Sequence, residues 1–177
     1  MAGFAGYLIK PLRRASLAER VQAVLGSGTR LPAAIEDDRV APAAAPGSKV
    51  LLVEDNPINA LLARTLLARE GCVVDHAEGG EQAIAALQVG RYDLILMDMR
   101  MPGLSGLDAT RRLRASGVTT PVVALTANAF EEDRHACLEA GMDDFLVKPL
   151  SPDALRAILT TLARGGWTQS ADRAKLG

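Results

Sequence analysis

The chain has 177 residues, 49% of them hydrophobic, and its 20 lysines and arginines nearly balance 21 aspartates and glutamates. So large an apolar share excludes wholesale disorder, and the length suits one ordinary domain with residues to spare or two very small domains. The formal net charge of −1 and the 3% aromatic content argue against a nucleic-acid-binding surface, which usually carries a basic excess or stacking rings.

The first residues show no targeting segment. The apolar stretch before Lys10 lacks a basic leading region and is interrupted by glycine, which makes it a poor signal peptide. No uninterrupted apolar run approaches the ~20 residues that a membrane-spanning helix needs. Cys72 and Cys137 lie far apart without paired spacing, which disfavours a disulfide framework or a thiolate zinc site. We therefore expect a cytoplasmic protein that neither spans a membrane nor binds one.

The chain before residue 49 is predicted to contain no complete domain. Residues 3–12 parallel residues 141–150 position by position, and a helical stretch follows in both places. We interpret residues 1–25 as the last strand and helix of a second module of the same kind, too short to bury a core alone. Residues 26–48 are rich in proline and alanine, which favours extended backbone and predicts a linker.

Strand-like and helix-like segments alternate from residue 49 onward. The apolar runs are continuous, which is typical of parallel strands covered on both faces. Asn56 before Pro57 and Ser151 before Pro152 are typical helix starts. The pattern predicts a doubly wound α/β fold over residues 49–164, followed by a flexible tail over residues 165–177. The predicted strands are residues 50–53, 73–74, 94–97, 122–125 and 145–147, and the predicted helices are residues 57–70, 81–88, 106–115, 130–140 and 152–164.

Polar side chains follow most of the predicted strands. Ligands of an open parallel sheet bind outside the carboxyl ends of its strands, so these residues are expected to share one site. Three crowded carboxylates repel one another unless a cation joins them, and an all-oxygen site suits Mg²⁺. A hydroxyl and an ammonium beside the cation would complete a receptacle for a phosphoryl group. The residues are Glu54, Asp55, Asp98, Thr126 and Lys148.

Four motifs stand at or near the ends of the predicted strands: Val53-Glu54-Asp55-Asn56, Leu96-Met97-Asp98-Met99-Arg100-Met101-Pro102-Gly103, Leu125-Thr126-Ala127-Asn128-Ala129 and Phe145-Leu146-Val147-Lys148-Pro149. By these motifs, residues 49–164 resemble the receiver domain of two-component response regulators and hybrid histidine kinases. Each motif that carries the resemblance is weak alone, but together they stand in register with the five predicted strands. The resemblance implies a flavodoxin-like parallel sheet with strand order 2-1-3-4-5. It also makes residues 1–25 the remnant of a preceding receiver, best explained by a truncated or mis-started reading of a longer chain.

The same resemblance assigns a role to each acidic residue. It implies that Asp98 accepts a phosphoryl group from a phosphohistidine of a partner protein. It implies that Asp55 and Asp98 bind Mg²⁺ together with the backbone carbonyl of Arg100, while Glu54 acts through water. Arg100 and Asn128 border the path of the attacking water and are expected to tune the lifetime of the phosphoaspartate.

The remaining roles concern the conformational switch. By the resemblance, Thr126 hydrogen-bonds the phosphoryl oxygen, Lys148 pairs with it, and Phe145 fills the space that Thr126 vacates. An aromatic residue in a final strand is also an ordinary core residue, so only the resemblance makes Phe145 a switch. The Lys148–Pro149 peptide bond is expected to be cis, a form found almost only before proline.

We expect a phosphoacceptor module rather than an enzyme, because no ATP-binding glycine motif of a kinase is present in the chain. The expected partner is a histidine kinase or a histidine phosphotransfer protein in the phosphorelay of a hybrid kinase, in which this receiver would be the terminal module. The alternative is a regulatory receiver that controls an attached kinase core through domain contacts. A small hydrolase on the same fold is a weak third hypothesis, since Asp98-Met99-Arg100 lacks the second aspartate of aspartate-nucleophile phosphatases.

Two further hypotheses concern the N-terminal residues. Asp37-Asp38-Arg39 interrupts the linker, and its simplest role is solubility; the alternative is a tether that docks on a receiver and holds a kinase inactive. Tyr7 and Arg13 flank a Lys-Pro turn, where an aromatic face beside a guanidinium could bind an anionic nucleotide second messenger. Short constellations of this kind have a high false-positive rate.

Other conspicuous side chains have simpler interpretations. His76 and His135 stand alone in the sequence and are interpreted as surface residues. Cys137 is interpreted as a small buried hydrophobic residue. A basic cluster in the third predicted helix is interpreted as a solvated face; it consists of Arg111, Arg112 and Arg114.

Overall fold

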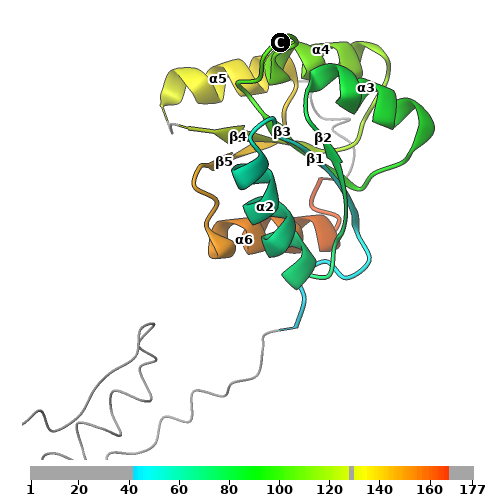
Figure 1. Cartoon of the computed structure of the whole chain (residues 1–177), viewed down its shortest axis with the longest axis vertical. Coiled ribbons are helices and arrows are strands. Elements are labelled where there is room, and N and C mark those ends of the chain that lie inside the picture. The colour runs from blue at the N-terminus through cyan, green and yellow to red at the C-terminus, as the bar shows by residue number, and fades with distance from the viewer. Residues whose placement is uncertain (1–41, 128–129, 168–177) are drawn as a thin grey trace, which may run out of the picture. The chain divides into compact units, whose positions relative to one another are not determined.

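Within the part of the chain that the structure describes, five parallel strands form one sheet in the order β2-β1-β3-β4-β5 (Figure 1). This computed structural model describes residues 42–127 and 130–167 of the chain. The order confirms the predicted fold, in which β1 lies beside β2 and β3 and the chain then winds outward to β5. The strands are β1 Lys49–Val53, β2 Val73–Ala77, β3 Leu94–Asp98, β4 Val122–Thr126 and β5 Asp144–Val147.

Helices cover both faces of the sheet. Helices α2 and α6 lie on one face, and α3, α4 and α5 lie on the other (Figure 1). Side chains of β1 pack alternately into the cores on the two faces of the sheet. Val50 and Leu52 pack toward α2 and α6, whereas Leu51 and Val53 pack toward α3, α4 and α5. The helices are α2 Pro57–Arg69, α3 Gly80–Val89, α4 Gly106–Ala115, α5 Glu131–Ala140 and α6 Pro152–Ala163.

The sequence signals for the helix starts are confirmed. The Asn56 side chain accepts hydrogen bonds from the backbone N–H groups of Ile58 and Asn59, and Pro57 is the first residue of α2. Ser151 caps α6 in the same way. Strand β2 is longer than the predicted run, since it continues to Ala77. An edge strand borders solvent, so polar residues extend β2 without interrupting its pairing with β1.

The residues just before β1 pack on the domain. Ala45 is only 1% exposed and belongs to the core cluster that contains α2 and α6. The Glu70 carboxylate at the end of α2 accepts the backbone N–H of Ala44 at 2.8 Å and pairs with Arg156 of α6 at 2.8 Å. Arg156 also donates to the carbonyl of Pro42. The last residues of the predicted linker are therefore held against the domain at the pole opposite the carboxyl ends of the strands.

Arg114 corrects the interpretation of the basic cluster. Its guanidinium donates to the carbonyls of Gly141 at 2.9 Å and of Val118 and Thr120 at 2.8 Å each, and it pairs with Asp143 at 2.8 Å. This side chain therefore joins two loops, and only Arg111 and Arg112 lie on an exposed face. The spacing of arginines on a helix does not show which of them meets carbonyls of a neighbouring loop.

The histidine and cysteine interpretations are confirmed, because both histidines are exposed and Cys137 is buried. Within the described part of the chain, no helix is long and apolar enough to cross a membrane. The N-terminal remnant, most of the linker, Tyr7, Arg13 and Asp37-Asp38-Arg39 lie outside the described residues, as does the end of the predicted tail. Those interpretations stay predictions.

Candidate functional site

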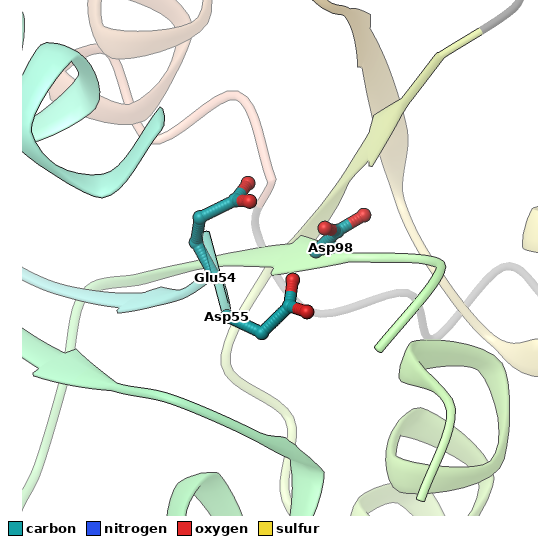
Figure 2. Close-up of side chains that lie close together, drawn as sticks. All are labelled: Glu54, Asp55 and Asp98. Carbon is teal, nitrogen blue, oxygen red and sulfur yellow. The ribbon is translucent and has the colours of Figure 1, made fainter. Parts of the chain in front are cut away.

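The carboxyl ends of β1 and β3 bring three carboxylates together (Figure 2). Glu54 and Asp55 follow β1, and Asp98 is the last residue of β3. One oxygen of each carboxylate lies within 4.8 Å of one oxygen of the other two. Glu54 and Asp98 are 1% and 5% exposed, whereas Asp55 is exposed. We call these three residues the acidic cluster.

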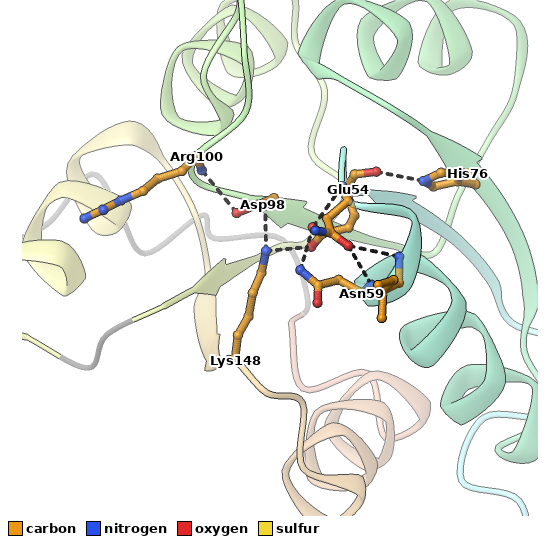
Figure 3. A network of polar contacts seen from close by, with 8 residues as sticks. Glu54, Asn59, His76, Asp98, Arg100 and Lys148 are labelled. Carbon is orange, nitrogen blue, oxygen red and sulfur yellow. Dashed lines mark hydrogen bonds and ion pairs between the residues drawn. The ribbon is translucent and has the colours of Figure 1, made fainter.

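Lys148 supplies the positive charge that faces the acidic cluster (Figure 3). Its Nζ atom lies 2.6 Å from Oε2 of Glu54 and 2.6 Å from Oδ2 of Asp98. The residue follows β5, its backbone N–H donates to the carbonyl of Thr126, and its peptide bond to Pro149 is cis. One ammonium therefore bridges carboxylates from two different strand ends.

Burial and pairing change the pKa values of this bridge. Burial alone lowers the pKa of Lys148, but its hydrogen bonds to Asp98 and Glu54 and their charges outweigh that effect, so its pKa is raised. Lys148 therefore stays charged through the neutral pH range. Burial raises the pKa of Asp98 despite its hydrogen bonds to Lys148 and to the backbone N–H of Arg100. Desolvation of Asp98 therefore outweighs these two hydrogen bonds and disfavours the charged form of the carboxyl group.

The loop after β3 holds Asp98 from its other side. The backbone N–H of Arg100 donates to Oδ1 of Asp98 at 3.1 Å, while the Arg100 side chain extends away from the carboxylate (Figure 3). The backbone N–H of Gly106 donates to the carbonyl of Met99 at 3.2 Å. A β-carbon at Gly106 would lie 2.0 Å from the backbone oxygen of Asp98. The start of α4 therefore packs directly against the backbone that carries the acidic residue.

The predicted switch residues lie on the neighbouring strands. Thr126 ends β4 and is 5% exposed. Phe145 in β5 is half-buried against the core under α3, α4 and α5. The guanidinium of Arg134 lies 5.7 Å from the centre of the Phe145 ring, within the range of a cation–π contact. Asn128 lies outside the described residues.

The acidic cluster fits a magnesium ion by the chemistry of its donors. All three side chains offer carboxylate oxygens, and one of them is exposed to solvent. Mg²⁺ prefers oxygen ligands and retains several waters, which suits a cluster open on one side. The two buried carboxylates share a single ammonium, so a divalent cation would relieve the remaining repulsion.

Comparison with known proteins identifies the family. The family model of the response regulator receiver domain matches residues 50–160. The chain belongs to this family. The receiver of sensor histidine kinase PA1611 from Pseudomonas aeruginosa, solved with magnesium in its active-site cleft, is 45% identical and gives a TM-score of 0.61. That match covers 66% of this chain and 97% of the other.

Larger relatives match this chain over only part of their own length. The full-length structure of ShkA, in complex with AMPPNP, is 60% identical with a TM-score of 0.63; the match covers 91% of this chain and 32% of that chain. Sensor protein GacS of Pseudomonas syringae is 41% identical over 133 residues, which are 72% of this chain and 15% of GacS. The present chain therefore spans a minor part of these relatives.

A receiver relative has also been solved with a partner bound. The receiver domain of Ssk1, in its complex with the histidine phosphotransfer protein Ypd1 of Saccharomyces cerevisiae, is 30% identical to this chain. The match has a TM-score of 0.63 and covers 69% of this chain and 92% of that one. The partner in that complex is a histidine phosphotransfer protein, and the module that binds it is a receiver domain like the one in this chain.

Two contacts of this receiver domain were not predicted. The Asn59 side chain donates from Nδ2 to Oε1 of Glu54 at 3.0 Å, and a ring nitrogen of His76 lies 2.8 Å from the backbone oxygen of Glu54 (Figure 3). A polar residue in the first turn after the Asn56-Pro57 helix start was the available signal for Asn59. For His76, the available signal was its position near the end of the second strand, because that strand pairs with the strand that precedes Glu54.

Proposed function

We propose that this receiver accepts a phosphoryl group on Asp98 from a phosphohistidine, in a magnesium-dependent reaction within a hybrid-kinase phosphorelay. The observation that supports the proposal is the bridge of Lys148 between Glu54 and Asp98, beside the exposed carboxylate of Asp55. The similarity to ShkA and to the PA1611 receiver supports the hybrid-kinase context. The module itself would turn over no other substrate.

Each residue of the site would have its own role in phosphoryl transfer. An Asp98 oxygen forms the new bond to phosphorus while the bond between phosphorus and the donor imidazole breaks, so no external base is needed. Mg²⁺, held by Asp55, Asp98 and the Arg100 carbonyl with Glu54 acting through water, would neutralise charge on the transferred group. Lys148 is already charged and placed at Asp98, where it would pair with a phosphoryl oxygen.

The phosphorylated state would differ from this one around β4 and β5. Movement of Thr126 and Lys148 toward the phosphoryl group would open space beside β4 for the Phe145 ring. The Arg134 contact to that ring would then break, since it requires the present ring position. These steps would change the surface formed by α5 and β5, to which a partner could bind with different affinity in the two states. In this proposal Arg100 and Asn128 set how long that state lasts.

Removal of magnesium provides the direct test. We expect acetyl phosphate to label the protein in buffer with millimolar Mg²⁺ and labelling to fall by roughly 100-fold or more after chelation with EDTA, because metal stabilisation of transferred charge is worth several kcal/mol. Intact-protein mass spectrometry would measure the added mass, and peptide mapping would locate it. Equal labelling with and without Mg²⁺ would contradict the magnesium-dependent reaction.

An exposed apolar stripe next to the acidic cluster is the proposed contact for the phosphohistidine partner. Ile58, Leu61 and Leu62 of α2 are 77%, 67% and 42% exposed. They lie on the helix that begins at Pro57, two residues after Asp55. Exposed apolar side chains grouped beside a reactive site mark interaction surfaces, and the Ypd1 complex of the Ssk1 receiver supports a helical phosphotransfer protein as the partner.

Leu61→Glu should separate partner docking from chemistry. We expect transfer from a phosphotransfer protein that labels the wild-type domain to slow ~10-fold, because loss of a central apolar contact costs more than about 1 kcal/mol. Labelling by acetyl phosphate should stay unchanged, since that donor needs no docking surface. Val89→Glu is the matched control, because Val89 is 91% exposed and ends α3 instead. Equal slowing with both donors would place the defect in the site rather than in docking.

A further inference from the structure

Asn59 fixes one side of the Glu54 carboxylate (Figure 3). Oε1 of Glu54 accepts the Nδ2 donor of Asn59 at 3.0 Å and the backbone N–H of Asn56 at 3.3 Å. Oε2 of the same carboxylate pairs with Lys148 at 2.6 Å. Each oxygen of this buried carboxylate thus has its own partners, and Asn59 provides the shorter contact on one of them.

Loss of the Asn59 donor would leave Glu54 free to turn. Only the longer bond from the Asn56 backbone would then remain at Oε1. The carboxylate could rotate to present both oxygens to the Lys148 ammonium, because a cavity of about 30 Å³ lined in part by Glu54, Asn59 and Lys148 offers room for this movement. Such a double pairing would engage both Glu54 oxygens with the ammonium, so that neither would be available to the waters around a cation.

We propose that Asn59 is a positioning residue that keeps Oε1 of Glu54 from turning to the Lys148 ammonium and thereby strengthens the binding of Mg²⁺. Asn59 acts through Glu54, and the inference rests on the proposed function only in assigning Mg²⁺ to the cluster. Glu54 would act on the cation through water, and holding it in its orientation before the cation arrives lowers the cost of binding, as outer-shell hydrogen bonds do in metal sites. The exposed position of Asn59 on α2 makes its replacement compatible with folding.

The test compares magnesium binding in Asn59→Leu and wild type by isothermal titration calorimetry. Leucine has nearly the shape of asparagine but lacks the donor, so packing against the cavity is retained. We expect the magnesium dissociation constant to rise roughly 3- to 10-fold, the net effect of one ordinary hydrogen bond. The magnesium concentration for half-maximal labelling by acetyl phosphate should rise by the same factor, while the rate at saturating Mg²⁺ stays within twofold.

Thr65→Ala is the matched control, because Thr65 is an exposed polar residue of the same helix whose hydroxyl bonds only to the Leu61 carbonyl among the described contacts. Its dissociation constant should equal that of wild type. An unchanged dissociation constant in Asn59→Leu, or a lower rate at saturating Mg²⁺ without a change in affinity, would overturn the inference. Failure of wild type to be labelled would instead contradict the proposed function, since calorimetry measures binding without phosphoryl transfer.

Discussion

Asp98→Asn is expected to abolish labelling by acetyl phosphate and by any phosphohistidine partner, a loss of roughly 1000-fold or more. The amide of asparagine is a poor nucleophile, so the phosphorus–oxygen bond cannot form at this position. The substitution is nearly isosteric, and the backbone N–H of Arg100 can still donate to the remaining oxygen. It also removes one of the two carboxylates that share Lys148. Because the shape is kept and one of three crowded negative charges is removed, we expect the variant to stay folded.

The control for this variant is Asp93→Asn. Asp93 accepts the backbone N–H of Lys49 at 2.7 Å, near the amino end of β1 and far from the acidic cluster. An asparagine oxygen can accept the same hydrogen bond, so labelling should match wild type. Incorporation would be followed with radiolabelled donor and by peptide mapping. Labelling of Asp98→Asn at the wild-type rate would assign the phosphoryl group to another residue and contradict the proposed role of Asp98.

Gly106→Ala should be the most damaging conservative substitution near the site. Its β-carbon would lie 2.0 Å from the backbone oxygen of Asp98 and 2.9 Å from its carbonyl carbon. Neither atom belongs to a flexible side chain, so α4 and the end of β3 would have to separate. We expect a loss of about 3 kcal/mol in the free energy of unfolding, the upper part of the range for overpacked cores. Urea denaturation followed by circular dichroism would measure it.

Gly79→Ala provides the comparison for that prediction. Gly79 also stands at a helix start, its φ of −175° is extended backbone that alanine adopts, and a β-carbon there would meet no atom within 4 Å. Its unfolding free energy should stay within about 0.5 kcal/mol of wild type. Equal loss of stability in the two variants would show that the close approach of Gly106 to Asp98 is unimportant. Gly106→Ala should also slow labelling, because the shifted backbone carries Asp98.

Much of the acidic cluster could be predicted because parallel strands share one carboxyl edge. Residues that follow successive apolar runs must meet at that edge, whatever the details of packing. This reasoning placed Glu54 and Asp55 beside Asp98, and it placed Lys148 at the same edge. The resemblance to receiver domains added the strand order, which the structure confirms, and the assignment of roles, which stays a proposal.

Contacts between separate elements could not be predicted in this way. Arg114 lies at a position that helix periodicity would leave half-exposed, yet it binds carbonyls of two loops. Asn59 was overlooked because its partner Glu54 precedes the helix start, and only the angle between β1 and α2 brings the two side chains within 3.0 Å. The packing of Ala45 on the domain likewise depends on Glu70 and Arg156, which come from helices distant in sequence.

The sequence by itself determined the alternation of strands and helices, the caps that begin α2 and α6, and the set of polar residues at the carboxyl edge. These features follow from local periodicity and from the geometry common to all parallel sheets. Only the tertiary structure decided that Lys148 is shared between Glu54 and Asp98, and that Asn59 holds one of these carboxylates. These contacts depend on small differences in the distances between elements, and those distances are set by the packing of the whole core.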